Sequence, residues 1–588
     1  MTVELVEIAG CMHVAPELAR LHAEEWSHLY PEWDERAALA EFEAMTEPGR
    51  VPTTWVAFDG PDRSIGGVLG SVSLILDDEL VGHRSLGPWL ASLYVMSTAR
   101  RLGVGGLLVD RVVGEAHRLG IERLYLFTAG QEEYYERRGW RTVSRPPMQG
   151  HDTALMLYDT WPNAPRRAAV SRWCSNPHVG GAYSFLRVGG TSADRERMSE
   201  PIAVGLHLAG EATSAAYPGT AHGAWFSGER AAAAAIAERD GEPGAVAVVG
   251  AGLAGIAAAR RFGAAGWQVT VFEAGEEPGG RVRVDRSLGA AAPLGATWAH
   301  GTDGNPFLEL ARRVGVDEIE GVFDAPATFV AGHGIVGDAD QRRLGQRFTD
   351  LERSLLTMGA TGGDRPVGPA LRTLLDAIEE PLDHAALACW FRGEFENLYA
   401  APVDELSLQT PTEAFRLPGP DVMLACDLGR AVTLAVEEIE GIDLRLGSVV
   451  TGVRRTGDGW AVDAGSAVTH RVDAVVVTVP IGVLQRGLIE FSPPLPADLT
   501  ASIDRIGAGP VAKAFFTFDT AWWAPHRAFW AAGPEPLLFE LWVDVSPILG
   551  RPALCAFAVG DAALAAEAMS EDELCAAAGR VLRDVTCT

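Results

Sequence analysis

Residues 245–275, AVAVVGAGLAGIAAARRFGAAGWQVTVFEAG, hold the strongest pattern in the chain. A short apolar run, 245–249, leads into a glycine-rich turn, and a second apolar run, 268–272, follows an alanine-rich stretch with helical periodicity. Strand, turn, helix and strand within about 30 residues make a βαβ unit. The pattern therefore predicts a parallel, Rossmann-like α/β sheet.

The turn has the spacing G-x-G-x-x-G, with Gly250, Gly252 and Gly255. Backbone amides at such a turn, and the dipole of the helix behind it, can receive a pyrophosphate. Glu273, followed by Ala274, ends the second strand about 20 residues on, where a carboxylate can accept hydrogen bonds from ribose hydroxyls. The spacing alone is a weak signal, but strand, helix and carboxylate together predict a dinucleotide site.

The residues that follow resemble the flavin-containing amine oxidase family, which includes polyamine oxidases, monoamine oxidases and flavin-type histone lysine demethylases. The resemblance begins at EPGGRV, 277–282, and continues at LGATWAHG, 294–301. It implies FAD as the cofactor, with Gly280 and Arg281 approaching its diphosphate. The residues that it places along the isoalloxazine are Gly295, Ala296, Thr297 and Trp298.

Two downstream segments carry the same resemblance, VDAVVVTVPIGVLQRGLIEFSPPLP at 472–496 and IGAGPVAKAFFTFDTAWW at 506–523. The second places Lys513 at the family's active-site lysine, which is hydrogen-bonded through a water to flavin N5. Lys513 is also the single lysine of the sequence, and the other basic side chains are arginines, which cannot supply a compact, titratable ammonium. The resemblance also gives the backbone of Val450 a contact with adenine.

The segment HLAGEATSAAYPGTAHGAWFSGERAAAAAI, 207–236, resembles the run that ends this family, whose amides face the flavin pyrimidine ring. Here it precedes the glycine-rich turn, and RWCSNPHVGGAYSF, 172–185, resembles the stretch before it. We therefore predict a circular permutation, with a degenerate fragment that retains no flavin as the alternative. The cofactor residues that this run implies are Gly210, Glu211 and Thr220.

Single residues refine the expected chemistry. Ala182 stands where monoamine oxidases have the cysteine that bonds to flavin, and Cys174 is offset by eight positions, so the FAD should be non-covalent. Tyr183 aligns with one wall of the family's aromatic cage, and Thr220 replaces the other wall. The resemblance implies that an amine gives a hydride to flavin N5, that the iminium is hydrolysed, and that oxygen is reduced to hydrogen peroxide. Desolvation should lower the pKa of Lys513.

The N-terminal residues, 1–160, alternate short strand-like and helical runs. A strand at 88–96 is followed by R-x-x-G-x-G at the start of a helix, which presents amides to a pyrophosphate. Together with QEEYYERRGW, 131–140, this resembles the GNAT acetyltransferase family and implies acetyl-CoA as a cofactor.

The GNAT resemblance also implies individual roles. Tyr135 would be the general acid beside the coenzyme sulfur, and strand amides around Val95 would polarise the thioester carbonyl. No general base stands out, and Glu24 and Glu25 in the first helix are candidates only by position. The residues that would hold the coenzyme are Arg100, Gly103, Gly105 and Gly106.

The patterns predict an α/β multidomain chain of six segments. These are a GNAT-like domain, 1–160, a linker, 161–172, the displaced segment, 173–244, the FAD-binding βαβ region, 245–305, a mainly helical substrate domain, 306–445, and the remainder of both domains with the active-site lysine, 446–588.

Composition narrows the expected partners. A formal charge of −29 opposes nucleic-acid phosphates, and seven cysteines without metal or disulfide spacing predict reduced thiols and no metal site. The sequence contains no run of 18 apolar residues. We expect a cytoplasmic protein that acts on a small-molecule amine and O2, without nucleic-acid or membrane partners, and the sequence does not fix its oligomeric state.

Three functions stay open at this point. The chain could be a bifunctional enzyme that acetylates an amine and oxidises an amine, or a working oxidase with an inert GNAT binding or assembly module. A third possibility is an α-amino acid substrate, which would need an arginine clamp on its carboxylate. Arg392 and Arg416 are the unassigned candidates for that clamp.

Overall fold

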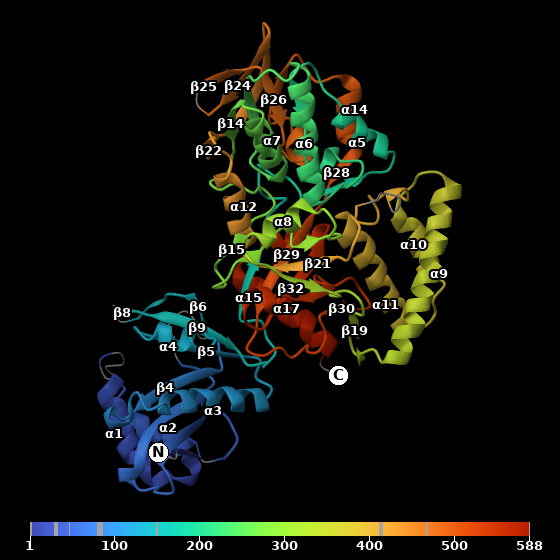
Figure 1. Ribbon diagram of the computed structural model, residues 1–588. Coiled ribbons are helices and arrows are strands. Elements are labelled where there is room, and N and C mark those ends of the chain that lie inside the picture. Colours follow the sequence, from blue (N-terminus) through green and yellow to red (C-terminus); the bar gives the residue numbers. More distant parts are fainter. Residues whose placement is uncertain are drawn as a thin grey trace. The chain divides into compact units, whose positions relative to one another are not determined.

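The computed structural model describes residues 3–26, 28, 33–45, 47–78, 86–148, 151–410, 415–465 and 468–586. The chain is a mixed α/β protein that divides into two compact units, Met1–Ala164 and Pro165–Thr588 (Figure 1). Each unit has its own sheets and its own hydrophobic clusters, as expected of separate domains.

The first unit is built on a seven-stranded sheet in the order β1-β2-β3-β4-β5-β9-β6. Only β4 and β5 pair in parallel among these strands. The apolar face of helix α3 packs on β3 and β4. The elements are β1 (Val3–Glu7), α1 (Ala15–Trp26), α2 (Glu35–Ala44), β2 (Thr53–Asp59), β3 (Val68–Ile75), β4 (Trp89–Val95), α3 (Val104–Arg118), β5 (Arg123–Thr128), α4 (Glu132–Glu136), β6 (Arg141–Ser144), β7 (Pro147–Met148), β8 (His151–Asp152) and β9 (Ala154–Asp159).

Strand β4 is interrupted by a bulge. Ser92 has a φ of 51°, and the register with β3 shifts between Ser71 and Ser73. A bulge takes backbone groups out of the ladder and bends the strand. Among the described residues the register of β4 with β5 ends at Trp89, whereas Tyr94 and Val95 still pair with β3.

The second unit contains the predicted parallel sheet, in the order β12-β26-β13-β14-β22. Its central strands β13 and β26 are almost wholly apolar and buried, as is usual for a parallel sheet covered on both faces. The glycine-rich turn joins β13 to α7, so the predicted βαβ unit is confirmed. The elements are β12 (Leu206–Leu208), α6 (Ala221–Ala237), β13 (Ala245–Val249), α7 (Leu253–Ala264), β14 (Gln268–Phe272), β22 (Asp443–Arg445) and β26 (Ala474–Val477).

Two elements of this layer come from the segment before the glycine-rich turn. Strand β12 pairs with β26, Leu206 opposite Val475. Helix α6 lies beside α7 (Figure 1), and Gly228 is so close that an added Cβ would lie 2.0 Å from the Ala254 oxygen. The segment is therefore an integral part of the dinucleotide-binding layer.

A second large sheet has the order β10-β29-β32-β31-β30-β19-β20. All seven residues of β29 are buried, and helices α16 and α17 pack against strands of this sheet. The elements are β10 (Arg167–Val170), β19 (Ala327–Val330), β20 (Gly334–Ile335), β29 (Val511–Thr517), β30 (Ala528–Ala532), β31 (Leu541–Asp544), β32 (Ala553–Val559), α16 (Asp561–Ala568) and α17 (Glu571–Thr586).

Strand β10 lies inside the range for which the sequence predicts a linker, 161–172. It pairs antiparallel with β29, and the buried Ala168 and Ala169 give it a small apolar surface. Arg167 pairs with Glu571 of α17 at 2.5 Å. The apolar run is too short to indicate a strand by itself, and only the neighbouring β29 makes it one.

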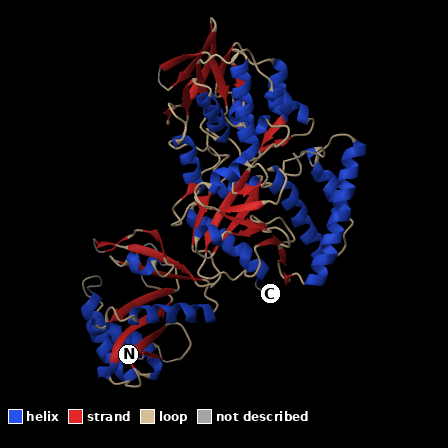
Figure 2. Cartoon of the chain, in the orientation of Figure 1, coloured by secondary structure: helices blue, strands red, loops and turns tan. Residues whose placement is uncertain are grey.

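The region 306–445 is helical beside the large sheet, as Figure 2 shows, but it also contributes strands. Strands β19 and β20 extend the large sheet, which the prediction of a mainly helical region misses because both strands are very short. The elements are α8 (Pro306–Arg312), β18 (Asp317–Glu320), α9 (Asp338–Gly362), α10 (Val367–Leu375), α11 (Pro381–Arg392), a π-helix (Gly393–Asn397), β21 (Val422–Ala425) and α12 (Leu428–Glu437).

The remaining elements of the second unit connect these layers. They are β11 (Ser184–Leu186), α5 (Ser192–Ser199), β15 (Val284–Asp285), β16 (Ala292–Pro293), β17 (Trp298–Ala299), β23 (Val450–Thr456), β24 (Gly459–Ala464), β25 (Val468–Val472), α13 (Ile481–Gln485), β27 (Glu490–Ser492), α14 (Ala497–Arg505), β28 (Ile506–Ala508) and α15 (Ser546–Leu549).

Candidate functional site

One cavity of about 1940 Å³ runs through the second unit, from the end of β14 to β29. Ligand pockets for small molecules usually measure about 300–1,000 Å³, so this cavity has room for a dinucleotide and a substrate together. Most residues that the sequence assigns to the oxidase site line it. They are Tyr183, Gly210, Glu211, Thr220, Gly250, Gly252, Glu273, Ala274, Gly280, Arg281, Gly295, Ala296, Thr297, Trp298, Val450 and Lys513.

The remaining predicted glycine, Gly255, shapes the turn from behind. It lies in α7, where an added Cβ would be 1.9 Å from the Gly250 oxygen. Gly250 itself has a φ of 107°, a conformation that side chains rarely adopt. These two glycines let the chain pass from β13 into α7 in a tight turn.

The turn forms a cradle that fits a dinucleotide. An added Cβ on Gly280 would lie 3.2 Å from the Cα of Gly252, so the two backbones approach closely at the start of α7. Glu273 accepts hydrogen bonds from the amides of Ala251 and Gly275, both at 2.7 Å. A pyrophosphate at the N-terminus of α7 would meet free amides and the positive end of the helix dipole.

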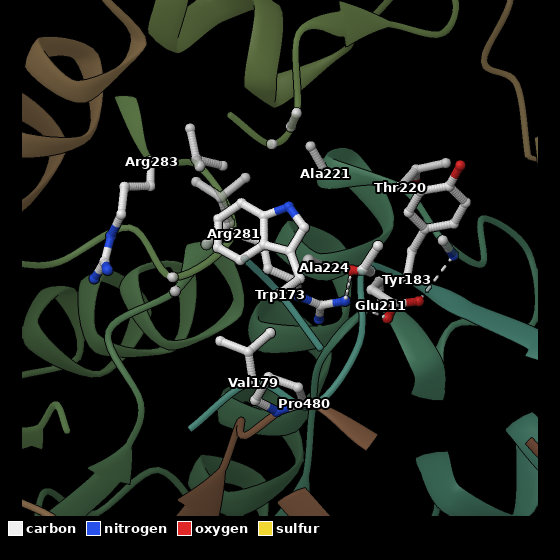
Figure 3. A pocket seen from close by; sticks show the side chains of 18 of the residues that line it. Trp173, Val179, Tyr183, Glu211, Thr220, Ala221, Ala224, Arg281, Arg283 and Pro480 are labelled. Atoms are coloured by element: carbon white, nitrogen blue, oxygen red, sulfur yellow. Dashed lines mark hydrogen bonds and ion pairs between the residues drawn. The ribbon is translucent and has the colours of Figure 1, made fainter. Parts of the chain in front are cut away.

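Arg281 and Glu211 tie the segment 173–244 to this cradle. Arg281 Nη1 donates to Glu211 Oε1 at 2.9 Å and to the Ala182 oxygen at 2.6 Å (Figure 3). Glu211 Oε2 accepts from Ser184 Oγ at 2.5 Å and from the Gly219 amide at 2.9 Å. Burial raises the pKa of Glu211, but the Arg281 charge and these hydrogen bonds outweigh it and hold the pKa below its ordinary value.

Lys513 projects from β29 into the same cavity. Its Nζ donates to the Gly295 oxygen at 2.6 Å and to Thr297 Oγ1 at 2.7 Å. The Nζ also lies 4.6 Å from the ring centre of Trp298 and 5.5 Å from that of Phe557. Burial lowers the pKa of Lys513 to about 8, so its ammonium can lose a proton near neutral pH.

Tyr183 and Thr220 are held by the backbone around them. The Tyr183 hydroxyl donates to the main-chain oxygen of Asn397 in the π-helix, and burial raises the pKa of Tyr183. Thr220 caps α6, accepting from the Gly223 amide at 2.9 Å. The Thr220 hydroxyl is therefore engaged in its own helix.

No cysteine lines the cavity among the residues that the structure describes. Ala182 occupies the wall near Arg281. Cys174 lies outside the lining, where burial and the Glu567 carboxylate raise the pKa of its thiol to about 12. A thiol so far from its thiolate form is a poor nucleophile for covalent attachment.

Sequence reasoning missed several polar groups at the substrate end of the cavity. Glu394 and Asn397 reach it from the π-helix, and Asn397 Oδ1 is buried with no partner in the described part of the chain. His300 lies in segment 294–301, and its Nδ1 is 3.0 Å from Asp421 Oδ2. The sequence could have indicated His300, because it lies two residues after Trp298 in a segment assigned to the site. It could not have indicated Glu394 and Asn397, because a π-helix has no recognisable sequence pattern.

The two candidate arginines for a carboxylate clamp differ in position. Arg392 does not line the cavity, and its Nη2 and Nε donate to the Glu540 carboxylate at 2.5 and 3.0 Å. Arg416 lines the cavity but lies 3.2 Å from Asp421. Neither guanidinium is a free clamp.

The first unit carries a separate constellation at the start of α3. Gly103 precedes the helix with a φ of 88°, and an added Cβ there would meet nothing within 4 Å. Arg100 Nε donates to the Val95 oxygen at 3.0 Å, bridging β4 to this turn. The N-terminus of this helix is thus open to an anionic ligand.

The two adjacent tyrosines, Tyr134 and Tyr135, lie in different places, one at the turn before α3 and one in the core. Tyr135 packs against Trp140 in the core, and burial raises its pKa. The Tyr134 hydroxyl is buried with no hydrogen-bond partner among the described residues, and it would lie 2.8 Å from a Cβ added to Gly105. A Cβ on Gly106 would lie 2.5 Å from Arg138 Nη2. Tyr134, which the sequence did not single out, is the tyrosine at the helix start.

The two candidate bases of this unit are paired. Glu24 accepts from Arg20 at 2.5 Å, and Glu25 lies 3.6 Å from Arg100. Across the described ranges of both units, no cluster of three potential metal ligands occurs. No helix in those ranges is long and apolar enough to cross a membrane.

Two family models match different parts of the chain. The model of the family "Flavin containing amine oxidoreductase" matches residues 157–236, 253–397 and 427–586, and that of the acetyltransferase (GNAT) family matches residues 15–140. The protein named Probable polyamine oxidase 4 of Arabidopsis thaliana is 29% identical over 351 residues, which cover 56% of this chain and 68% of the relative.

A histone demethylase homologue and a solved putrescine oxidase structure are also similar. The Lysine-specific histone demethylase 1 homolog 1 of Arabidopsis thaliana is 30% identical over 366 residues, covering 58% of this chain and 42% of the relative. A solved structure of putrescine oxidase is 18% identical with a TM-score of 0.46, covering 58% of this chain and 82% of the other. Because the first family model accounts for more than half of its residues, the chain belongs to the flavin-containing amine oxidoreductases and carries a GNAT-family domain ahead of its oxidase.

Proposed function

We propose that the second unit binds FAD non-covalently and oxidises a C–N bond of a neutral amine group to an imine, with O2 reduced to H2O2. We also propose that the substrate carries a second, cationic nitrogen. The observation that carries this proposal is the position of the single lysine, Lys513, in the cavity whose other end is the glycine-rich turn. When bound, FAD would supply the acceptor for the hydride of the amine.

The chain's own residues divide the work along the cavity. Gly252, Gly280 and the start of α7 would hold the pyrophosphate, and Glu273 the ribose. Lys513 holds or releases a proton at Nζ, next to the place where Trp298 lines the cavity. The ring of Tyr183, fixed by its bond to the π-helix, would orient the amine and exclude water from it.

The substrate end favours a cation. Glu320, Asp324 and Glu394 line it. Burial raises the pKa of Glu394, and the Glu352 charge adds to the shift. All three residues are exposed, and an ammonium on the substrate would be attracted by their carboxylates and would offset the desolvation of Glu394. The relatives named polyamine oxidases support an amine with a second positive nitrogen, whereas the paired arginines give an amino acid carboxylate no free clamp.

Peroxide release tests the substrate class. We expect diamines and polyamines to give peroxide faster than amino acids. Glu394→Gln should raise KM for a diamine at least tenfold, with a much smaller effect on a monoamine of equal chain length, because only the diamine carries a second ammonium. Glu405→Gln, an exposed carboxylate outside the cavity lining, is the matched control. An equal effect on both amines would exclude Glu394 as the cation site, and preferred oxidation of amino acids would contradict the proposal itself.

We infer further that the first unit binds acyl-CoA and transfers its acetyl group to an amine, which makes the chain bifunctional. The open turn at Gly103 and the bulge of β4 at Ser92 support this, because both free backbone amides for the coenzyme. Tyr134, whose hydroxyl lies beside Gly105, is the proposed general acid in place of the sequence candidate Tyr135, which packs in the core. An inert GNAT module attached to a working oxidase remains the competing function.

Release of coenzyme A thiol by the full chain separates these two functions. Gly103→Trp should abolish coenzyme binding while the flavin absorbance stays unchanged. Gly120→Trp is a matched control, since Gly120 also has a positive φ, 70°, and open space, but follows the other end of α3. A parent chain that releases no thiol with any amine acceptor would favour the inert module, and loss of flavin in Gly103→Trp would contradict separate nucleotide sites.

A further inference from the structure

Thr297 contacts the only lysine of the chain. Its side chain is buried, with 2% exposure, and Oγ1 lies 2.7 Å from Lys513 Nζ. The same hydroxyl donates to the Gly295 oxygen at 3.0 Å. Since that proton is already used, a lone pair of Oγ1 must face Lys513, and the lysine must be the donor between them.

The second partner of Lys513 is also an acceptor. Nζ donates to the Gly295 oxygen at 2.6 Å, and a carbonyl oxygen cannot donate back. An ammonium has three N–H bonds and a neutral amine has two. Thr297 and Gly295 therefore occupy two N–H bonds in either state. The third position on Nζ carries a proton when the lysine is charged and a lone pair when it is neutral.

We propose that Thr297 is a positioning residue that fixes which face of the Lys513 nitrogen titrates. With two directions held by acceptors, the remaining one belongs to the cavity that Lys513 lines. The group facing the proposed amine and flavin then changes from donor to acceptor when a single proton leaves. The threonine acts through the lysine and needs no contact with either ligand.

Few other groups near Lys513 can influence its pKa. Strand β32 brings the ring of Phe557 and Cys555, whose thiolate would raise the pKa of Lys513. Burial raises the pKa of the Cys555 thiol to about 12, so this group is neutral where Lys513 titrates. Strand β17 brings the ring of Trp298, and Ser171, next to β10, accepts only from the Lys513 backbone amide, at 2.9 Å. In the described part of the chain, Cys555 is the one titratable group close enough to shift the pKa of this ammonium by its charge.

The inference rests on the proposed role of Lys513 in amine oxidation, so its test uses no amine. Because the chain has one lysine, protein grown with lysine isotope-labelled at Cε gives one lysine resonance. Its chemical shift against pH measures the ionisation of Lys513 directly. The holoprotein is used as purified, with its flavin oxidised. The titration can contradict the role of Thr297 even if the protein oxidises amines, and it can support that role even if the protein does not.

Thr297→Val keeps the shape and removes the acceptor. The midpoint should fall by about one pH unit, because a hydrogen bond to a charged donor is stronger than the same bond to a neutral one. Thr297→Ser keeps the hydroxyl and should titrate like the parent. Thr297→Cys, whose sulfur is a weak acceptor, should fall between them and serves if the valine variant does not fold.

A second readout follows reoxidation of reduced flavin by oxygen across the same pH range, and its midpoint should move with the resonance. Titration of Thr297→Val and Thr297→Cys at the parent midpoint would overturn the proposal. Equal shifts in Thr297→Ser and Thr297→Val would also overturn it, since packing of the methyl group rather than the hydroxyl would then be responsible.

Discussion

The ammonium of Lys513 is surrounded by aromatic rings and neutral oxygens rather than by carboxylates. Rings attract a cation only modestly, and two hydrogen bonds do not replace full hydration. Burial therefore dominates and lowers the pKa of Lys513 to about 8. An arginine at this position would stay charged, which explains how one lysine can matter in a chain otherwise provided with arginines.

Replacing Lys513 by methionine tests its role. Methionine keeps the length and apolar stem of the side chain, so folding and flavin absorbance should persist. Reduction of the flavin by amine, or its reoxidation by oxygen, should slow at least tenfold, about 1.4 kcal/mol in barrier. Stopped-flow absorbance measures the two half-reactions separately. Lys513→Arg should not restore either rate, because a planar guanidinium cannot occupy the same compact position.

The proposed mechanism depends on that result. If Lys513→Met reduced and reoxidised its flavin at parent rates, the lysine would have no part in either step. The inference about Thr297 would then lose its functional meaning, although the titration of the lysine could still be measured.

Attachment of the flavin is also decided by single residues. Ala182 offers no thiol, and the Cys174 thiol is held in its protonated form. Acid or heat precipitation of the yellow protein should therefore release the flavin into the supernatant, where its absorbance is measured. Flavin that remained with the precipitate would contradict non-covalent binding.

Among the elements, the π-helix Gly393–Asn397 gives the substrate end its polar groups. The extra residue in this turn brings both Glu394 and Asn397 to the cavity, and π-helical turns occur often at functional sites. Gly393 permits it by packing on Trp530, where an added Cβ would lie 2.1 Å from a ring carbon.

Gly393→Ala should therefore disturb the substrate end without affecting flavin binding. The methyl group must displace either Trp530 or the π-helix, so we expect KM for the best amine to rise several-fold and the melting temperature to fall. Gly345→Ala in α9 is a matched control, because its Cβ would meet nothing within 4 Å. In a helix interior it should stabilise the protein by about 0.5–1 kcal/mol. Unchanged KM in Gly393→Ala would show that the π-helix does not shape the substrate site.

The elements also show what sequence alone can provide. The βαβ unit was predictable because its glycines and apolar runs are close together in the sequence. The position of Lys513 was predictable because segment 506–523 resembles the family and because the sequence has a single lysine. The position of Glu394 was not, since it depends on one additional residue in a helical turn. Strand β10 exists only because β29 pairs with it. Tyr135 packs against Trp140 in the core, and Tyr134 therefore lies at the start of α3.

At the scale of the whole molecule, we propose that the oxidase is circularly permuted. The segment 173–244 supplies β12, α6 and Glu211 to a site otherwise built from 245–588. The two ends of the second unit are also close: Pro165 packs against Gly579 of α17, about 10 Å of helix before its last described residue, Thr586. Permutation is tolerated where ends are adjacent and exposed.

A chain written as 241–588 followed by a short linker and 165–240 should fold and bind flavin. Its absorbance spectrum should match that of the parent, because each contact of the cradle is restored. Residues 241–588 alone should bind none, since Arg281 would lose Glu211 and the sheet would lose β12. Flavin bound equally by 241–588 alone would contradict the circular permutation, whereas a parent chain that retained no flavin would support the degenerate-fragment alternative.

The burial of Lys513 has a consequence for the durability of the protein. Amine oxidation yields aldehydes, which condense with lysine amines, and acyl-CoA thioesters acylate the same groups. Both reagents would be present wherever the two proposed reactions run. Within these 588 residues the single lysine side chain is 8% exposed, and the other cationic side chains of the Lys/Arg class are guanidinium groups, which are far weaker nucleophiles. The two proposed reactions would therefore find few lysine amines to modify on this chain, and Lys513 itself is reached through the cavity that it lines.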